Sequence, residues 1–595
     1  MERLLSQTCA SRFCILNFAL CILHCSRISK AKIRAVWIAR PLSLALSPAA
    51  GARGQRRWGC QWLMAAVLIC GCGISSSASA EEIYSNTTGG GAWSDPATWQ
   101  GGKVPAAEDD VVISKDDTVE FDRHDDGVIT CHNLALDPRG LLQFRTDAGP
   151  IVMSVSGMID SYGYIRLDGT KSSKDHHELR FVAELPEERM LKISKGGGLI
   201  VAGKGGLAKG RRNAVLLGKP PVKELPAGSP PADPTAIVEA GTGSTLDMQK
   251  ADIVNVYVQA TGIDNTGAKL GERMNLLKNR FTGTSRLIVT SCDSGIIADN
   301  LFERDDPYPL PNPAIYLVGS PLLELRNTVI RGNYPGGVTG YGQSESSMTN
   351  TLVEKCAQGV YWYGSGFMIK NLHIRECPHG LTLTSAAGTV EDVLIEKSQT
   401  AYYHGGATAQ ITNLVIRDMA PSPTGYKIHY YSGPLTLINS PVLPEDISFS
   451  PGFIPLPPVE GKPRLPTVQM LHFVVAQVGG QVPPGVSVEF KSTQLPAPLP
   501  AGAQDPNVRN SPALVLKNGM TPYPRTLEPL IVRGWQMDAD GKLRPAPTYQ
   551  LNILGPILGE NGERKVLKSL SVTPEAAWFR ADPNDKKPTV EVSLP

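Results

Sequence analysis

Short apolar segments recur through the middle of the chain at a nearly constant distance from an asparagine or aspartate. The second position before that polar residue and the third position after it are apolar in most repeats. Segments such as 371–374 and 413–416 are rich in β-branched residues and lack a helical period, which predicts strands. The polar residues are spaced by 21 to 27 positions: Asn255, Asn279, Asn300, Asn327, Asn350, Asn371, Asp392, Asn413 and Asn439.

A second strand is predicted after each turn. Glycine is frequent nine or ten residues after the asparagine, as at Gly359 and Gly380, and a strand such as 360–363 follows it. Repeats of about 20 to 30 residues are typical of solenoids. We therefore predict an all-β chain whose residues 236–443 form a right-handed parallel β-helix.

Stacking of coils explains why the recurring residue is asparagine. Equivalent residues on successive coils lie about 4.8 Å apart. A buried asparagine can then donate its side-chain amide to the next coil and accept from the previous one. Such a ladder satisfies polar groups that would otherwise cost about 1 to 3 kcal/mol each. We interpret these residues as architectural rather than catalytic.

The fourth position after the asparagine alternates in charge on consecutive repeats. Opposite charges on neighbouring strands stabilise each other, and like charges do not. We therefore expect an exposed structural ladder of ion pairs, formed by Arg331, Glu354, Arg375, Glu396 and Arg417.

The region before the repeats carries paired tryptophans. Residues 91–105, with Trp93-Ser-Asp-Pro-Ala-Thr-Trp99 at their centre, precede predicted strands at 109–113 and 118–122. This string resembles the extracellular domain family named for its eight glycines, which includes the hyaluronan-binding protein of cell migration and fibrocystin. The resemblance implies a β-rich domain, here 83–218, that stands before a parallel β-helix and caps its open strand edges. We expect Trp93 and Trp99 to anchor its core, with sugar stacking as the alternative.

Proline-rich segments separate the remaining parts of the chain. Residues 219–235 and 444–466 are expected to be linkers or insertions. Residues 467–595 contain several predicted strands with turn signals between them, which is typical of a β-sandwich-like domain.

The first 80 residues have the features of a targeting segment. Arg53, Arg56 and Arg57 form a basic region, 62–73 is apolar, and Ala78-Ser-Ala80 matches a signal-peptidase site. We expect a secreted, cell-surface or periplasmic protein cleaved after Ala80, without an integral membrane span in the mature chain. Residues 1–50 precede this complete signal, which suggests a start codon placed too early. Two alternatives are a membrane anchor at 15–23 and a lipoprotein-type box at 69–72.

Charge and cysteine content exclude some classes of function. Residues 1–80 hold ten Lys and Arg and one acidic residue, so the other 48 basic and 55 acidic residues give a net charge of −7. That balance argues against a nucleic-acid partner. Seven of eleven cysteines lie before residue 73, and no zinc-type spacing is present. Cys356 and Cys377 fall on adjacent coils, as a pair of buried thiols or, alternatively, a disulfide.

Candidate chemistry lies in the long intervals between asparagines. The 27-residue interval inserts Asp305, Asp306 and Tyr308, and Tyr341 follows in the next interval. Paired carboxylates serve acid–base hydrolysis when suitably separated, and they are also hard ligands for Ca²⁺. A solvated turn is the alternative for the two aspartates. We expect no other cofactor.

Outward side chains on the second strand of each coil form another candidate site. If Val360 points inward, Tyr361 and Tyr363 point outward and align with Tyr403, with His404 beside them. A row of aromatic faces suits sugar rings, although simple stabilisation of the sheet is the alternative.

These features lead to three hypotheses. The first is an exported surface protein that binds polysaccharide along the β-helix through Tyr308, Tyr341, Tyr361, Tyr363 and Tyr403. The second is a polysaccharide lyase or glycoside hydrolase using Asp305, Asp306 and His404. The third is a structural cell-envelope or adhesive protein. The sequence assigns no oligomeric state, and a fold by itself assigns no activity.

Overall fold

The computed structural model describes 81–122, 128–147, 149–172, 175–183, 190–204, 212–219, 236–263, 273–305, 310–422, 425–449, 468–479, 482–492, 514–515, 530–537, 542–557, 564–579 and 589–594. Residues 1–80, with the predicted cleavage site and both alternatives for that segment, lie outside the described residues. So do Asp306, Tyr308 and most of the two proline-rich segments.

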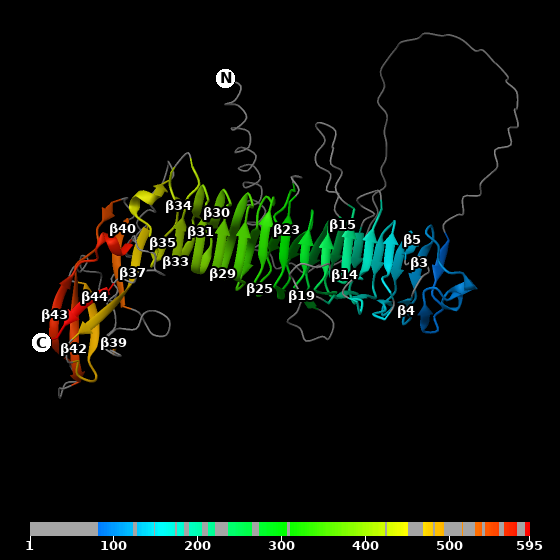
Figure 1. The fold of residues 1–595 in the computed structure, drawn as a ribbon, viewed down its shortest axis with the longest axis horizontal. Coiled ribbons are helices and arrows are strands. Elements are labelled where there is room, and N and C mark those ends of the chain that lie inside the picture. Colours follow the sequence, from blue (N-terminus) through cyan, green and yellow to red (C-terminus); the bar gives the residue numbers. More distant parts are fainter. Residues whose placement is uncertain are drawn as a thin grey trace, which may run out of the picture. The chain divides into compact units, whose positions relative to one another are not determined.

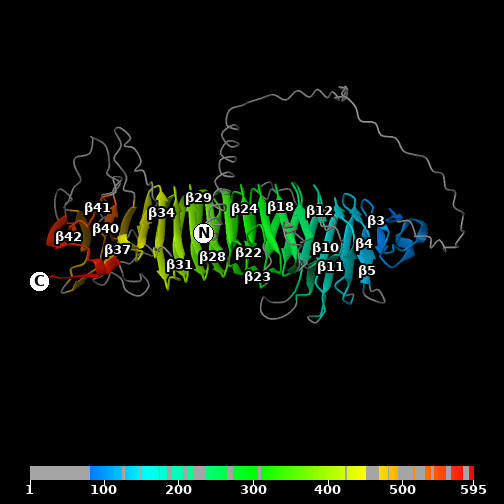
Figure 2. The same cartoon turned by 90° about the horizontal axis from the view of Figure 1, so that it is seen from above.

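Most of the described strands form a parallel β-solenoid. Figures 1 and 2 show the strands of successive coils lying side by side. Each coil visits three parallel sheets in turn. Sheet 1 consists of β1 (Glu82–Tyr84), β3 (Asp110–Ile113), β6 (Leu134–Leu136), β9 (Ile159–Ser161), β12 (Met190–Ile193), β15 (Ala236–Ala240), β18 (Val256–Thr261), β21 (Arg286–Thr290), β24 (Ile315–Val318), β27 (Val338–Ser344), the start of β29 (Gln358–Arg375), β30 (His379–Thr384), β32 (Thr400–Gly405), β34 (Ile428–Ser432) and β36 (Ile447–Phe449).

Sheets 2 and 3 continue each coil. Sheet 2 consists of β2 (Gly90–Ala92), β4 (Thr118–Phe121), β7 (Leu141–Phe144), β10 (Tyr164–Asp168), β13 (Gly198–Ala202), β16 (Thr245–Gln249), β19 (Arg273–Leu277), β22 (Gly295–Ala298), β25 (Leu323–Arg326), the start of β28 (Ser347–Glu354), the middle of β29, the starts of β31 (Ala387–Glu396) and β33 (Thr408–Arg417), β35 (Leu435–Ile438) and the start of β37 (Val468–Gly479). Sheet 3 consists of β5 (Val128–Cys131), β8 (Val152–Val155), β11 (His177–Phe181), β14 (Ala214–Gly218), β17 (Asp252–Val254), β20 (Arg280–Thr282), β23 (Leu301–Arg304), β26 (Val329–Gly332) and the ends of β28, β29, β31 and β33.

The ladders run without a break across the division expected near residue 218. β12 pairs with β15, and β14 pairs with β17, so residues 82–218 supply coils to the same three sheets as the later repeats. Trp93 and Trp99 are buried at 1% and 2% exposure, and their rings pack edge to face at 4.9 Å. These tryptophans therefore belong to the core, as expected.

Left-handed backbone angles mark the corners of the coils. Between sheets 2 and 3 the corner residue has positive φ, as at Asn327 (48°), Asn350 (50°) and Asn371 (52°). The residue after it turns inward, as the buried Thr328 and Thr351 do. Asparagine and aspartate tolerate this conformation better than most other residues with a side chain.

The predicted asparagine ladder is present, but its details differ from the prediction. Asn350 donates to Asn327 at 2.9 Å, and Asn439 donates to Asn413 at 2.6 Å, so each amide donates to the preceding coil rather than the next. Asn327, Asn350 and Asn371 are exposed rather than buried. Asn439 at the equivalent corner also has a positive φ, of 52°, but it is only 3% exposed, as predicted.

Three of the nine predicted rungs occupy other positions. Asn279 and Asn300 are the buried residues that follow the corner, and the Asn300 side-chain oxygen accepts from the Asn279 backbone N–H at 2.8 Å. Asn255 lies at the corner between sheet 3 and sheet 1. Asp392 keeps the outer corner position and accepts from Asn413 at 2.7 Å. The predicted repeat length is therefore correct. The asparagine lies one residue after the corner at positions 279 and 300, and at the corner itself from position 327 onward.

A second core lies beyond the solenoid. β37 pairs with β35 in parallel and with β40 (Leu530–Met537) in antiparallel fashion, and it also pairs with β44 (Thr589–Ser593). The strands β38 (Ser487–Ser492), β39 (Leu514–Val515), β42 (Tyr549–Ile557) and β43 (Arg564–Val572) form a separate antiparallel sheet, and β41 (Leu543–Arg544) pairs with β40. Buried side chains from both sheets share one cluster, as predicted for a sandwich-like domain.

The helical elements within the described ranges are short 3₁₀ turns: η1 (Pro96–Thr98), η2 (Gln100–Gly102), η4 (Pro444–Asp446) and η5 (Ala576–Phe579). Among the described residues, no helix has the length and apolar character needed to cross a membrane.

Candidate functional site

Sheet 1 directs tyrosines to the outside of the solenoid. In β29, Val360 and Trp362 are buried at 0% and 1% exposure. Tyr361 and Tyr363 point outward, because successive residues of a strand face opposite sides. Gly340 lies opposite Trp362 on the preceding coil, where a Cβ would come within 3.0 Å of the indole. The glycine makes room for the indole, and the predicted orientation of both tyrosines is confirmed.

Tyrosine and threonine alternate along the central outward row of sheet 1. Tyr316 pairs with Thr339, which pairs with Tyr361 on the next coil. The row continues through Thr382 to Tyr403. Together with neighbouring aromatic residues this row forms a surface that we call the tyrosine strip: Tyr316, Thr339, Tyr341, Tyr361, Tyr363, Thr382, Tyr403, His429 and Tyr431.

Four tyrosines on three consecutive coils form one end of the strip. The centroid of the Tyr341 ring lies 5.8 Å from that of Tyr316, 5.2 Å from that of Tyr361 and 6.2 Å from that of Tyr363. Tyr341 and Tyr363 remain exposed at 37% and 38%. Mutual ring contact orders these side chains while it leaves part of their surface open to solvent.

Tyr403 lies at the other end of the strip. Its ring stacks on that of His429, with centroids 5.2 Å apart and planes inclined by 17°. Gly405 allows the ring to lie close to the backbone, because a Cβ there would be 2.8 Å from Cε1 of Tyr403. Burial raises the pKa of the Tyr403 phenol, and the phenols of Tyr431 and Tyr361 raise it further. Its hydroxyl therefore stays protonated and able to donate at neutral pH.

The strands that carry the strip contain no charged residue. Asp, Glu, Lys and Arg make up 19% of the whole chain, yet none occurs in β24, β27, 358–365 of β29, β30, β32 or β34. In the same coils each strand of sheet 3 carries at least one Arg or Glu, as at Arg331 and Glu354. The charged residues thus lie outside the strands that carry the strip, and Lys427, which directly precedes β34, forms an ion pair with Asp446 at 3.1 Å.

His404 does not face the strip. Its side chain is 0% exposed, and its Nδ1 lies 2.6 Å from the hydroxyl of the buried Tyr402. Burial lowers the pKa of His404 to about 4. Its ring also stacks on the ring of Tyr430 at 5.3 Å. His404 and Tyr403 are neighbours in sequence and therefore lie on opposite faces of β32, so His404 is separated from any ligand on the outer face.

The loop before β24 contributes one described carboxylate. Asp305 is exposed, and its backbone carbonyl accepts from the side-chain amide of Asn333 at 3.3 Å. Asp306 and Tyr308, its predicted partners, lie outside the described residues. No contact between Asp305 and His404 is present in the described part of the chain, because His404 is enclosed in the core.

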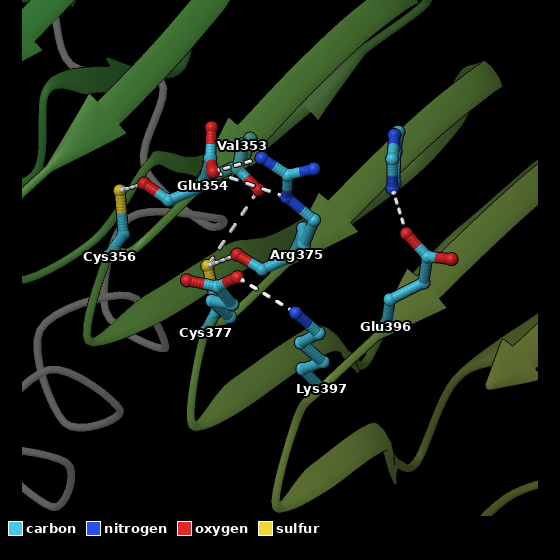
Figure 3. A network of polar contacts seen from close by, with 9 residues as sticks. Val353, Glu354, Cys356, Arg375, Cys377, Glu396 and Lys397 are labelled. Carbon is cyan, nitrogen blue, oxygen red and sulfur yellow. Dashed lines mark hydrogen bonds and ion pairs between the residues drawn. The ribbon is translucent and has the colours of Figure 1, made fainter. Parts of the chain in front are cut away.

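The alternating charges of sheet 3 form ion pairs along the solenoid. Glu354 lies opposite Arg375 and accepts a hydrogen bond from its Nε at 3.1 Å (Figure 3). Hydrogen bonding to Arg375 lowers the pKa of Glu354. Glu396 pairs with His373 at 2.8 Å, and Glu303, outside the predicted set, contacts both Arg280 and Arg331. The predicted pair of Glu354 and Arg375 is therefore present, although Glu354 is buried at 8% exposure rather than exposed. Arg331 and Glu396 instead contact residues outside the predicted set.

Cys356 and Cys377 lie at the next corner of the same coils (Figure 3). Both are unpaired thiols, at 1% and 0% exposure. The Cys377 thiol contacts the carbonyl of Arg375 at 3.5 Å, and that of Cys356 contacts the carbonyl of Glu354 at 3.6 Å. The pair is therefore the stacked pair of buried thiols that the repeat predicts.

Sequence reasoning missed three aromatic members of the strip, together with Thr339. Tyr316, His429 and Tyr431 lie within the two longest intervals, where counting from the asparagine loses the strand register. Alternation alone indicates their orientation, since Tyr316 lies between the buried Ile315 and Leu317.

Neither metal-ligand clusters nor comparisons with known proteins identify a function for this chain. Among the residues that the structure describes, no three His, Cys, Asp or Glu side chains converge as metal ligands. The chain matches no protein-family model and no curated protein. The tyrosine strip is therefore the feature from which a function is inferred.

Proposed function

We propose that this is an exported protein that binds carbohydrate along the outer face of sheet 1. One observation carries the proposal: tyrosines from every second coil are aligned in one row, on strands that contain no charged residue. The apolar faces of sugar rings stack on aromatic rings, and sugar hydroxyls pair with phenol and threonine hydroxyls. The targeting features of residues 1–80 support exposure to extracellular glycans.

The structural alternative is that the tyrosines only stabilise the sheet. Ring contacts such as Tyr341 with Tyr361 do contribute to stability. However, stabilisation alone does not need outward exposure, and Tyr431, Tyr363 and Tyr341 are 56%, 38% and 37% exposed. Exposed aromatic residues in one contiguous patch are typical of a binding surface.

Removal of single rings from the strip tests the proposal. Binding of the full chain to a panel of polysaccharides is measured by affinity electrophoresis and calorimetry. We expect Tyr361→Ala and Tyr403→Ala to weaken binding by roughly two- to tenfold each, the value of one aromatic contact. The matched control is Tyr162→Ala, since Tyr162 is 46% exposed and lies outside the strip. Undiminished binding in both strip variants, or no binding to any polymer, would contradict the proposal.

A further inference from the structure

The tyrosine strip has a spatial period of two coils. Along its central row, rings at Tyr316, Tyr361 and Tyr403 are separated by Thr339 and Thr382. The two threonines are only 9% and 8% exposed, so the rings alone dominate this row. With about 4.8 Å per coil, one ring recurs every 9.6 Å or so along the solenoid.

This period matches one class of polymer. In a linear β-1,4-linked hexose chain each sugar is turned over relative to the last, so the same ring face recurs at every second sugar. That two-sugar repeat has about the same length as two coils of the solenoid, roughly 9.6 Å. A chain lying parallel to the solenoid axis would therefore present an equivalent face to each of the three tyrosines.

The strands that carry the tyrosine strip lack charged residues, which favours a neutral polymer over an acidic one. A carboxylate or sulfate loses hydration when it is placed against a protein surface, and a cation must compensate for that loss. The six strip-bearing strands supply no Lys or Arg, and no Asp or Glu. Arg286 in the neighbouring β21 is 1% exposed and covers the ring of Tyr257 at 4.6 Å. Lys427, which directly precedes β34, forms an ion pair with Asp446 at 3.1 Å. Hydroxyl groups of neutral sugars need no such compensation.

We propose that the ligand of the tyrosine strip is a neutral, linear, β-1,4-linked hexose polymer that lies along the solenoid axis. The inference rests on the proposed carbohydrate binding and specifies the charge and repeat of the ligand. The outer tyrosines of the row, Tyr316 and Tyr403, are four coils apart, about 19 Å. Five sugars are needed to reach from the first ring to the third.

Two measurements on the full chain test this assignment. The first compares hydroxyethyl cellulose with carboxymethyl cellulose, which share a backbone and differ in charge, and with amylose, which is neutral but helical. We expect the hydroxyethyl ether to bind at least tenfold more tightly than the other two, with an affinity that does not depend on salt concentration. Equal or tighter binding of the carboxymethyl ether or of amylose would overturn the inference and leave carbohydrate binding intact.

The second measurement uses cello-oligosaccharides of two to six sugars. Affinity is expected to rise up to the pentasaccharide and then to level off, because the third stacking ring is engaged at that length. Tyr403→Ala should move this plateau to the trisaccharide, whereas the control Tyr162→Ala should leave it unchanged. A plateau that Tyr403→Ala does not move would overturn the two-coil match. If none of the polymers or oligosaccharides binds, both the inference and the proposed function fail.

Discussion

The side-chain amide of Asn371 donates a 2.7 Å hydrogen bond to the side-chain oxygen of Asn350 on the preceding coil. Both residues also hold left-handed backbone angles, with φ of 52° and 50°. Asparagine therefore serves two purposes at this corner: it tolerates the turn, and it links neighbouring coils. The two contributions can be separated by substitution.

Asn371→Ala is expected to destabilise the protein more than Asn371→Gly. Both changes remove the hydrogen bond, which contributes about 1 kcal/mol. Alanine adds a left-handed strain of about 1 to 2 kcal/mol that glycine does not have. The measurement is the urea midpoint followed by circular dichroism. Equal losses in the two variants would show that the conformational contribution is absent.

Exchange of Glu354 and Arg375 tests whether the charges act as a ladder. The double variant Glu354→Arg/Arg375→Glu keeps the pair but places a new arginine beside Arg331 and a new glutamate beside Glu396. Like charges on adjacent strands are destabilising, so we expect a loss of about 1 kcal/mol. Thermal unfolding at low and high salt measures it, and the loss should shrink in high salt. A double variant as stable as the natural protein would mean that the pair is independent of its neighbours.

The four buried cysteines are expected to resist alkylation in the folded protein. Burial raises the pKa of the Cys131 thiol to about 12 and also raises that of Cys292, which leaves little reactive thiolate near neutral pH. Cys356 and Cys377 are enclosed as well. Iodoacetamide labelling followed by peptide mass mapping, before and after unfolding in urea, gives the readout. Rapid labelling of any of the four in the native protein would contradict their burial.

Buried histidines make the fold sensitive to acid. The pKa of His404 is about 4 in the folded protein and 6.5 in the unfolded chain, so above pH 6.5 it is neutral in both. As the pH falls from 6.5 towards 4, only the unfolded state gains the proton, which removes up to about 3 kcal/mol of stability. His177, with a pKa of about 4, and His472, with a pKa of about 3, act in the same direction.

A paired substitution isolates the contribution of His404. Tyr402→Phe/His404→Phe removes both partners of their hydrogen bond and keeps the aromatic stack on Tyr430. Its unfolding free energy should fall less steeply between pH 6.5 and 4 than that of the natural protein. The remaining slope belongs to the other buried histidines and to carboxylates with a lowered pKa, such as Glu354. An unchanged slope would show that His404 does not titrate in this range.

Periodicity predicted the repeat architecture because each coil obeys the same local rules. Apolar residues around Asn371 and Asn413 had to face a common core, and the charges of Glu354 and Arg375 had to alternate once their coils were stacked. The same alternation placed Tyr361 and Tyr363 outside. Where the interval lengthened, counting from the asparagine lost its reference, so Tyr316, His429 and Tyr431 went unrecognised.

The alternation of side-chain direction along a strand also excludes His404 from the candidate site. His404 and Tyr403 are adjacent in sequence, and sequence reasoning grouped them into one site. Adjacent strand residues face opposite sides, so Tyr403 joins the surface and His404 joins Tyr402 and Tyr430 in the interior.

By itself the sequence determined the class of fold, the length of the repeat and the outward direction of individual tyrosines, since these follow from local pattern and strand alternation. Only the tertiary structure decided that Asn279 turns inward whereas Asn327 stays outside, and that Tyr316 joins the predicted row of Tyr361 and Tyr403. The physical reason is register: residues about 20 to 30 positions apart become neighbours through the stacking of coils, and a shift of one residue moves a side chain from the outside to the core.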